Sequence, residues 1–155
     1  MPPFELVEGE LDDPRVIALV THHAMDARAV LPQGKGHAFF IDGLSAPNIR
    51  FWSARRGDNI IGMGALKIHS AELGEVRSMR TIDKVRGQGL GHAILAHICA
   101  EARAMGLRQL GLETHPGPSF APAIALYKKH GFVKCGPFGD YVLDPDSIFM
   151  FKTFD

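Results

Sequence analysis

The chain has 155 residues, and 46% of them are hydrophobic, which is enough for one sizeable core, so we expect a single domain over residues 1–155. Lysine and arginine together number 17, as do aspartate and glutamate, which excludes an overall charge that would hold nucleic acid or a membrane surface. We find no basic leader and no apolar stretch near the roughly 20 residues that span a bilayer, so we expect a cytoplasmic protein. Cys99 and Cys135 lack C-x-x-C spacing and are interpreted as buried thiols.

The N-terminal part predicts a strand, a helix and an irregular segment. Residues 4–8 alternate apolar and acidic side chains, as an exposed strand does. Asp13 followed by Pro14 is typical of a helix start, and this helix is expected to end near Asp26. Glycines and prolines interrupt residues 29–48, which we interpret as a partly helical, mobile segment of the kind that forms lids.

The middle of the chain predicts three strands and a helix. Residues 50–55 and 60–68 flank a turn and predict a hairpin, and residues 75–81 predict the next strand. A glycine-rich loop follows, and an apolar repeat every three or four residues then predicts a helix that runs from Leu90 to Met105.

The C-terminal part predicts one more helix between strands. A short strand is expected at residues 109–113, a helix capped by Ser119 and running to Lys129, and two strands at residues 133–136 and 148–153. The order of the elements predicts an α/β fold with a mixed sheet flanked by helices.

The glycine loop has the features of a phosphate-binding site. A helix start leaves backbone N–H groups without intrahelical partners and adds roughly half a positive charge. Gly87, Gly89 and Gly91 allow a phosphate oxygen to approach that backbone without meeting a Cβ atom. The dinucleotide motif G-x-G-x-x-G fails because position 92 is His92, and the triphosphatase motif is absent from the sequence. The loop therefore predicts a phosphate or pyrophosphate ligand of another class.

The spacing R-x-x-G-x-G, carried by Arg86, Gly89 and Gly91, resembles the acetyl-CoA motif of the GNAT superfamily of N-acetyltransferases. A second family element, A-I-A-L-Y-K-K-H-G-F, runs from Ala123 to Phe132. The resemblance covers essentially the whole chain and implies an acetyl-CoA-dependent enzyme. It also implies a GNAT-like, mostly antiparallel sheet of about six to seven strands with about four helices.

The resemblance further implies how the cofactor is held. Backbone N–H groups of the loop would bind the pyrophosphate of CoA, and the strand before it would pair with the pantetheine arm. The residues implied are Met79, Thr81, Arg86, Gly87, Gln88, Gly89 and Gly91. Phe120 stands where many members have an asparagine, so one polar contact near the pantetheine arm is expected to be missing.

Two catalytic roles follow from the resemblance. Tyr127 of the second element would protonate the leaving thiolate, and Glu75 would remove the proton of the amine. Glu113 is an alternative base, and a bound amine that loses its proton to solvent is another. Arg77 shares a strand face with Glu75, so the two residues could also form a structural ion pair.

We expect direct transfer to a small primary amine or an amino-acid-like acceptor. A protein lysine or N-terminus, or a non-catalytic acyl-CoA-binding module, remains as an alternative. The candidate acceptor contacts are Glu113, His115, His37 and Asp140, with Tyr141 beside Asp140 on a rim loop. The histidine spacing does not favour a metal site, and the resemblance favours a homodimer.

Overall fold

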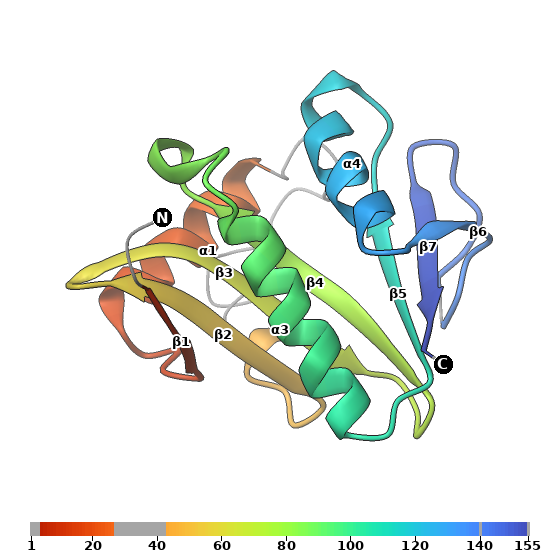
Figure 1. Ribbon diagram of the computed structural model, residues 1–155, viewed down its shortest axis with the longest axis horizontal. Coiled ribbons are helices and arrows are strands. Elements are labelled where there is room, and N and C mark those ends of the chain that lie inside the picture. The colour runs from red at the N-terminus through yellow and green to blue at the C-terminus, as the bar shows by residue number, and fades with distance from the viewer. Residues whose placement is uncertain (1–3, 27–42, 140, 155) are drawn as a thin grey trace. The chain divides into compact units, whose positions relative to one another are not determined.

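A computed structural model describes residues 4–26, 43–139 and 141–154. Its strands form one seven-stranded sheet in the order β1-β2-β3-β4-β5-β7-β6 (Figure 1). The strands are β1 (Glu5–Glu8), β2 (Ile49–Arg56), β3 (Asn59–Ile68), β4 (Leu73–Thr81), β5 (Gln109–Thr114), β6 (Val133–Cys135) and β7 (Ile148–Thr153). The helices are α1 (Pro14–Asp26), α3 (Leu90–Ala104) and α4 (Ala121–Lys129), with 3-10 turns η2 (Asp83–Val85) and η3 (Pro118–Phe120).

The mixed sheet confirms the predicted α/β class. Strand β4 pairs with β5 in parallel, whereas β1 with β2, β5 with β7 and β6 with β7 are antiparallel. The described residues hold three α-helices, rather than the expected four or so, and none of these helices could cross a membrane. The chain divides into two compact units, residues 1–65 with 78–94 and residues 66–77 with 95–155.

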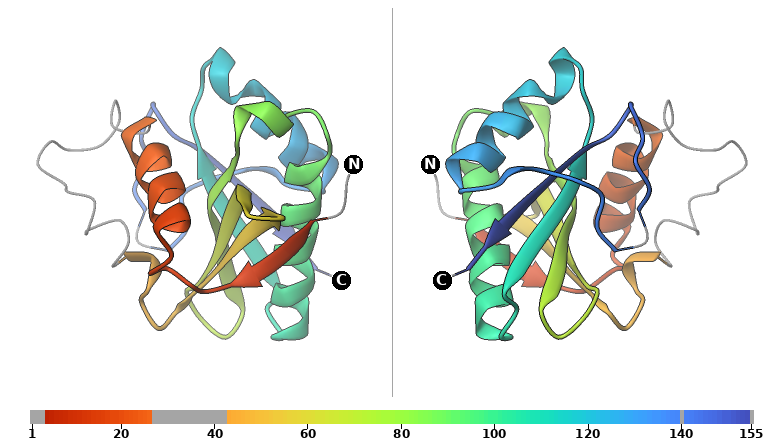
Figure 2. Two further views of the ribbon diagram at one scale, coloured as in Figure 1. Left: turned by 90° about the vertical axis from the view of Figure 1, so that its left-hand side faces the viewer. Right: turned by 90° about the vertical axis from the view of Figure 1, so that its right-hand side faces the viewer.

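In the first unit, helix α1 covers one face of strands β2 and β3 (Figure 2). Val16, Leu19 and Val20 of the helix lie in one buried cluster with Phe51 of β2 and Met63 of β3. The three helix residues recur at a spacing of three and four positions, which places them on one side of a 3.6-residue helix. The apolar pattern therefore decides which face of α1 is buried.

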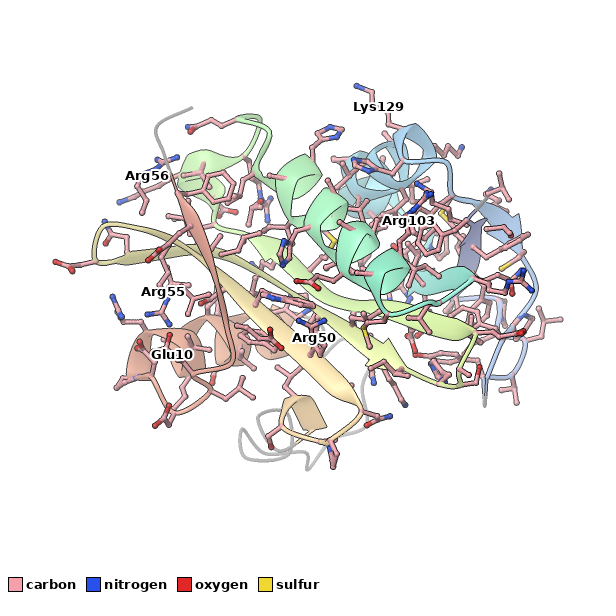
Figure 3. All side chains as sticks on the ribbon, turned by 60° about the horizontal axis from the view of Figure 1, so that its bottom comes forward. Glu10, Arg50, Arg55, Arg56, Arg103 and Lys129 are labelled. Carbon is pink, nitrogen blue, oxygen red and sulfur yellow. The ribbon has the colours of Figure 1, made fainter. Side chains whose placement is uncertain are left out.

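The start of α1 follows the sequence prediction. Oδ1 of Asp13 accepts a 2.8 Å hydrogen bond from the backbone N–H of Arg15, and Pro14 occupies the first helical position. Arg55 of β2 extends toward Glu10, with which it forms a 3.1 Å ion pair (Figure 3), and it lies 3.6 Å from Asp13. These contacts link the first turn of α1 to strand β2.

Gly62 in β3 allows the start of α3 to pack closely. A Cβ atom at this position would lie 3.0 Å from the side chains of Leu90 and Ile94 and from the carbonyl oxygen of Arg80. Contacts this short are tighter than a Cβ atom normally makes, so only glycine fits without displacement. A glycine inside a strand often marks a place where another segment approaches closely, and here that segment is the start of α3.

The second unit contains an equally close packing point at Gly74 in β4. A Cβ atom there would lie 2.9 Å from side-chain atoms of Leu66 and Leu107. Helix α3 ends at Ala104, and Gly106 follows two residues later with a φ of 86°. The N–H of Leu107 then bonds to the carbonyl of Ala102, which is the Schellman pattern expected after a C-terminal glycine.

The start of α4 differs from the prediction. Ser119 is predicted to cap this helix, but it lies inside the turn η3, and the cap position is Phe120, which makes no side-chain hydrogen bond. The cap and the start of the helix therefore lie one residue later than expected, with Ala121 as the first helical residue and a proline in the first turn. Because proline has no N–H group, one fewer backbone donor in this first turn needs a capping acceptor.

Candidate active site

The glycine loop lies between η2 and the first turn of α3, within the first unit. Gly87 and Gly89 have φ values of 81° and 86°, a region that other residues rarely adopt. A Cβ atom on either glycine would meet nothing within 4 Å, so the space beside this backbone is open. Gly91 lies in the first turn of α3, whose N–H groups lack intrahelical partners. The loop therefore fits an anionic pyrophosphate.

Not all of the predicted N–H donors are available in this loop. The N–H groups of Arg86 and Gln88 bond to carbonyl oxygens of the preceding turn at 3.3 Å. No acceptor for the N–H groups of Gly87 and Gly89 is found within the described parts of the chain. The guanidinium of Arg86 forms an exposed 3.1 Å ion pair with Asp83, a kind of contact that contributes little. The glycine backbone and the start of α3 therefore offer donors to a pyrophosphate, and the weak ion pair with Asp83 leaves the Arg86 side chain able to contribute as well.

Met79 and Thr81 lie on β4 immediately before this loop, and both are half-buried. Ser78 precedes them with a φ of 55°, which is uncommon for a residue other than glycine. Such a residue interrupts the regular pleat of a strand, as a bulge does. The backbone that is predicted to pair with pantetheine therefore begins at a local irregularity of β4.

The second unit contains a buried carboxylate, Glu75, on the same strand. Its residue is 2% exposed, yet both carboxylate oxygens have close partners. The hydroxyl of Tyr141 donates a 2.6 Å hydrogen bond to Oε2, and Nε2 of His69 lies 2.8 Å from Oε1. Nε of Arg77 is 3.9 Å from Oε2, so Arg77 is the most distant of the three partners. The ion pair that strand alternation suggests is therefore secondary to two hydrogen bonds. We call Glu75, His69, Tyr141 and Arg77 the Glu75 cluster.

Gly111 and Phe138 explain how the loop before β7 reaches the Glu75 cluster. Gly111 of β5 pairs in register with Glu75 of β4. A Cβ atom at position 111 would lie 2.6 Å from Phe138, so the phenyl ring occupies the space that a side chain would fill. The ring of Phe138 packs edge-on against Tyr141 and His69, with centroids 5.4 and 6.0 Å apart. Because Gly111 has no side chain, the ring of Phe138 can pack against it. Phe138 in turn helps to position His69 and Tyr141, the two hydrogen-bonding partners of Glu75.

The turn between β3 and β4 positions His69. Its backbone N–H bonds to the carbonyl oxygen of Leu73 at 2.9 Å, and Oγ of Ser70 accepts hydrogen bonds from the N–H groups of Glu72 and Leu73. Sequence reasoning missed His69 and Phe138 as site residues. No motif marks either residue, and the only sequence hint was the rim loop assigned to Tyr141.

Tyr127 lies on α4 with its ring edge-on to Phe132, at a centroid distance of 6.1 Å. Burial raises the pKa of Tyr127 to about 12. Its hydroxyl has no hydrogen-bond partner within the described residues. Tyr127 is therefore a protonated phenol whose donor is not used by the protein.

The other predicted acceptor contacts are bound elsewhere. Ser147 donates a 2.6 Å hydrogen bond to Oε2 of Glu113, and Nδ1 of His115 lies 2.8 Å from the carbonyl oxygen of Asp146. Both residues therefore hold the segment before β7, and neither is hydrogen-bonded to the Glu75 cluster. His37 and Asp140 lie outside the described residues.

Comparison with known proteins agrees with this loop and fold. The model of the acetyltransferase (GNAT) family matches residues 16–132. The chain is 41% identical to the uncharacterized N-acetyltransferase YsnE of Bacillus subtilis (strain 168) over 143 residues, which cover 92% of this chain and 95% of that protein. It is 43% identical to the IAA acetyltransferase of Azospirillum brasilense over 122 residues, 78% of each chain.

Among solved structures, an acetyltransferase from Streptococcus agalactiae 2603 superposes with a TM-score of 0.81 at 19% identity, covering 99% of this chain and 100% of that one. At this identity the likeness concerns the fold alone. The family model spans most of the chain, including the glycine loop, and YsnE is similar along nearly its whole length. The chain belongs to the GNAT family of acetyltransferases and is an N-acetyltransferase that uses acetyl-CoA.

Proposed function

We propose that this enzyme acetylates the primary amine of a small, amino-acid-like acceptor, by direct transfer from acetyl-CoA in a ternary complex. The observation that carries the proposal is the Glu75 cluster, in which a buried carboxylate lies beside an exposed arginine. The carboxylate and its partners can take up the amine proton, while the arginine can bind a carboxylate of the acceptor.

The proposed contacts to the cofactor are backbone groups. The N–H groups of Gly87, Gly89 and the first turn of α3 hold the pyrophosphate, and the backbone of Met79 and Thr81 holds the pantetheine arm. When bound, acetyl-CoA supplies a thioester that an amine can attack. The open space beside Gly87 and Gly89 supports this assignment, because a pyrophosphate needs close access to the backbone.

The Glu75 cluster provides the proton acceptor. An amine reaches the enzyme mostly as an ammonium ion and must lose a proton before its nitrogen can attack. The cluster can hold the resulting positive charge because the carboxylate of Glu75 already has two hydrogen-bonding partners in place. No reorganisation of these groups is needed during the reaction.

Tyr127 stabilises the leaving group in this proposal. Its pKa of about 12 lies well above the roughly 8.5 of an ordinary thiol. Full proton transfer from the phenol to a thiolate is therefore unfavourable. The hydroxyl instead donates a hydrogen bond to the sulfur as negative charge develops there.

Arg77 supports an acceptor that carries a carboxylate. Its side chain is 43% exposed, and its distance of 3.9 Å from Glu75 leaves the guanidinium donors able to bind another group. A guanidinium binds a carboxylate with two parallel hydrogen bonds, which orients as well as attracts it. A lysine within a protein lacks a free carboxylate beside its amine, so this feature favours a free amino acid. The name of the Azospirillum brasilense relative, an IAA acetyltransferase, also fits a small-molecule acceptor.

The test measures the rate of CoA release with each common L-amino acid as acceptor. Each rate is compared with that of the carboxamide derivative of the same amino acid. The amide keeps the amine and side chain but lacks the carboxylate, so the proposal expects a higher KM for the amide. Arg77→Gln should raise the KM of the amino acid at least tenfold and leave that of the amide unchanged. Arg108→Gln, at another exposed arginine of the same unit, is the control. Equal rates for acid and amide in the wild type would contradict carboxylate binding by Arg77.

A further inference from the structure

The carboxylate of Glu75 is poorly placed to meet an amine directly. The residue is 2% exposed, and each oxygen already contacts a polar group within 2.8 Å. The side chain of His69 is 14% exposed, so it is the more accessible end of the same hydrogen-bonded pair. Access therefore favours the histidine over the glutamate as the group that touches the acceptor.

We propose that Nδ1 of His69 is the atom that accepts the amine proton, and that Glu75 orients the imidazole and stabilises its charged form. This assignment rests on the proposed function and refines the proton acceptor within the Glu75 cluster. It makes His69 the catalytic base and Glu75 a positioning residue.

Hydrogen-bond chemistry specifies which nitrogen of His69 can act. An ionised carboxylate only accepts hydrogen bonds, so Nε2, at 2.8 Å from Oε1 of Glu75, must carry the hydrogen. A neutral imidazole has one protonated nitrogen, which leaves the lone pair on Nδ1. Tyr141 donates its own hydrogen to the other oxygen of Glu75, so the carboxylate cannot turn to a different pairing without breaking that bond.

The surroundings of Nδ1 leave it accessible. No hydrogen-bond partner for Nδ1 is found among the residues the structure describes. Gly139, with a φ of 58°, lies beside this edge of the ring, and a Cβ atom there would be 3.1 Å from both Nδ1 and Cε1. A larger residue at 139 would crowd this edge of the ring, and the glycine avoids that contact. Besides Glu75, the charged or titratable groups of the cluster are Arg77 and Tyr141.

The proton and electron pairs balance in this scheme. His69 takes one proton from the ammonium group of the acceptor, and the imidazolium is held by the carboxylate of Glu75. The freed lone pair of the nitrogen forms the new N–C bond. The C–S bond breaks, and the electron pair of that bond leaves with the sulfur, near the hydroxyl of Tyr127. The second proton of the nitrogen ends on the sulfur, and His69 returns its proton to water.

The first test needs no acceptor. Long-range ¹H–¹⁵N spectra of the full-length protein, labelled in its histidine rings, report which nitrogen of His69 carries hydrogen. At a pH where the spectra show the ring to be neutral, we expect the Nε2–H tautomer. Glu75→Gln should weaken that preference, because an amide can also donate. An Nδ1–H tautomer in the wild type would overturn the assignment.

The second test is chemical rescue with the best L-amino acid acceptor. His69→Ala should lower kcat/KM by at least about 100-fold, with part of the loss restored by added imidazole. Glu75→Gln should lower the rate without any rescue by imidazole. The matched control is His97→Ala, since His97 also pairs with a glutamate, Glu101 of α3, at 3.6 Å. This control should keep wild-type activity.

The outcomes separate this inference from the proposed function. A loss smaller than about threefold in His69→Ala, or rescue of Glu75→Ala by formate instead, would assign the base role to Glu75 and contradict the inference alone. A wild-type enzyme that releases no CoA with any amine would contradict the proposed acceptor class. The tautomer of His69 would then still decide whether Nε2 of His69 donates its hydrogen to Glu75.

Discussion

The hydroxyl of Tyr141 donates a 2.6 Å hydrogen bond to Oε2 of Glu75, from a position 66 residues further along the chain. Burial, and then this hydrogen bond, raises the pKa of Tyr141, so the phenol stays protonated at neutral pH and remains a donor. The contact joins the loop before β7 to strand β4 and helps to hold the carboxylate in one orientation. It is the longest-range hydrogen bond in the Glu75 cluster and makes the cluster sensitive to distant substitutions.

Tyr141→Phe should destabilise the protein, because among the described residues the remaining partner of this buried carboxylate oxygen is Arg77, at 3.9 Å. Loss of such a partner costs about 1–3 kcal/mol of unfolding free energy, which urea denaturation measures. Tyr127→Phe is the matched control, since that hydroxyl has no partner within the described residues. Equal stability of Tyr141→Phe and Tyr127→Phe would show that the bond to Glu75 contributes nothing.

Tyr127→Phe should instead affect turnover. Without the hydroxyl, no donor from this residue stabilises the developing thiolate, and kcat should fall tenfold or more, toward the roughly 10²–10³-fold that loss of one such hydrogen-bond donor costs. Calorimetric titration should give an unchanged Kd for acetyl-CoA, because the ring remains. An unchanged kcat would return Tyr127 to a purely packing role against Phe132.

Gly89→Ala should weaken the binding of CoA by at least about tenfold, because the added Cβ atom would occupy open space next to the proposed pyrophosphate site. Gly57→Ala is the control, since Gly57 also has a positive φ, 57°, and open space around its Cβ position. Both variants carry the same backbone strain of about 1–2 kcal/mol, so thermal denaturation should shift them alike. Calorimetry that finds equal CoA affinity in both would contradict the loop assignment.

Gly111→Ala should destabilise the second unit, because the new Cβ atom would lie 2.6 Å from the ring of Phe138. Overpacking of this kind costs about 1–3 kcal/mol of unfolding free energy. Activity should fall as well, since Phe138 packs against Tyr141 and His69. In the double variant Gly111→Ala with Phe138→Leu, the smaller side chain should recover part of the stability. A Gly111→Ala protein as stable as the wild type would contradict the packing argument.

The stability of α1 should depend on pH through Asp13. Its pKa is lowered to about 2, first by its side-chain hydrogen bond with Arg15 and then by the backbone bond to the same residue. The unfolded chain should have the ordinary value of about 3.9, so this contribution is complete above about pH 4 and is lost as pH falls toward 2. Urea denaturation should show wild type and Asp13→Asn differing at neutral pH and converging at low pH. A constant difference would contradict the linkage.

Local sequence predicts much of the fold and the cofactor loop of the candidate site. The apolar spacing of Leu90, Ile94 and Ile98 predicts α3, and Gly106 correctly predicts its end. The spacing of Arg86, Gly89 and Gly91 predicts the cofactor loop, because such a loop needs a few residues in a fixed order next to a helix start. Ser119 shows the limit of this reasoning, since a neighbouring proline changes how the first turn of α4 forms.

The sequence alone therefore determined the order of the elements, the family motif and the presence of a carboxylate at position 75. Only the tertiary structure decided the partners of that carboxylate, because His69 and Tyr141 lie 6 and 66 positions away and meet it through a turn and a loop. The packing of Phe138 depends on the absence of a side chain at Gly111. The apolar and polar pattern of the local sequence does not predict this contact. Contacts between distant segments arise from packing, and packing is decided by shape in three dimensions.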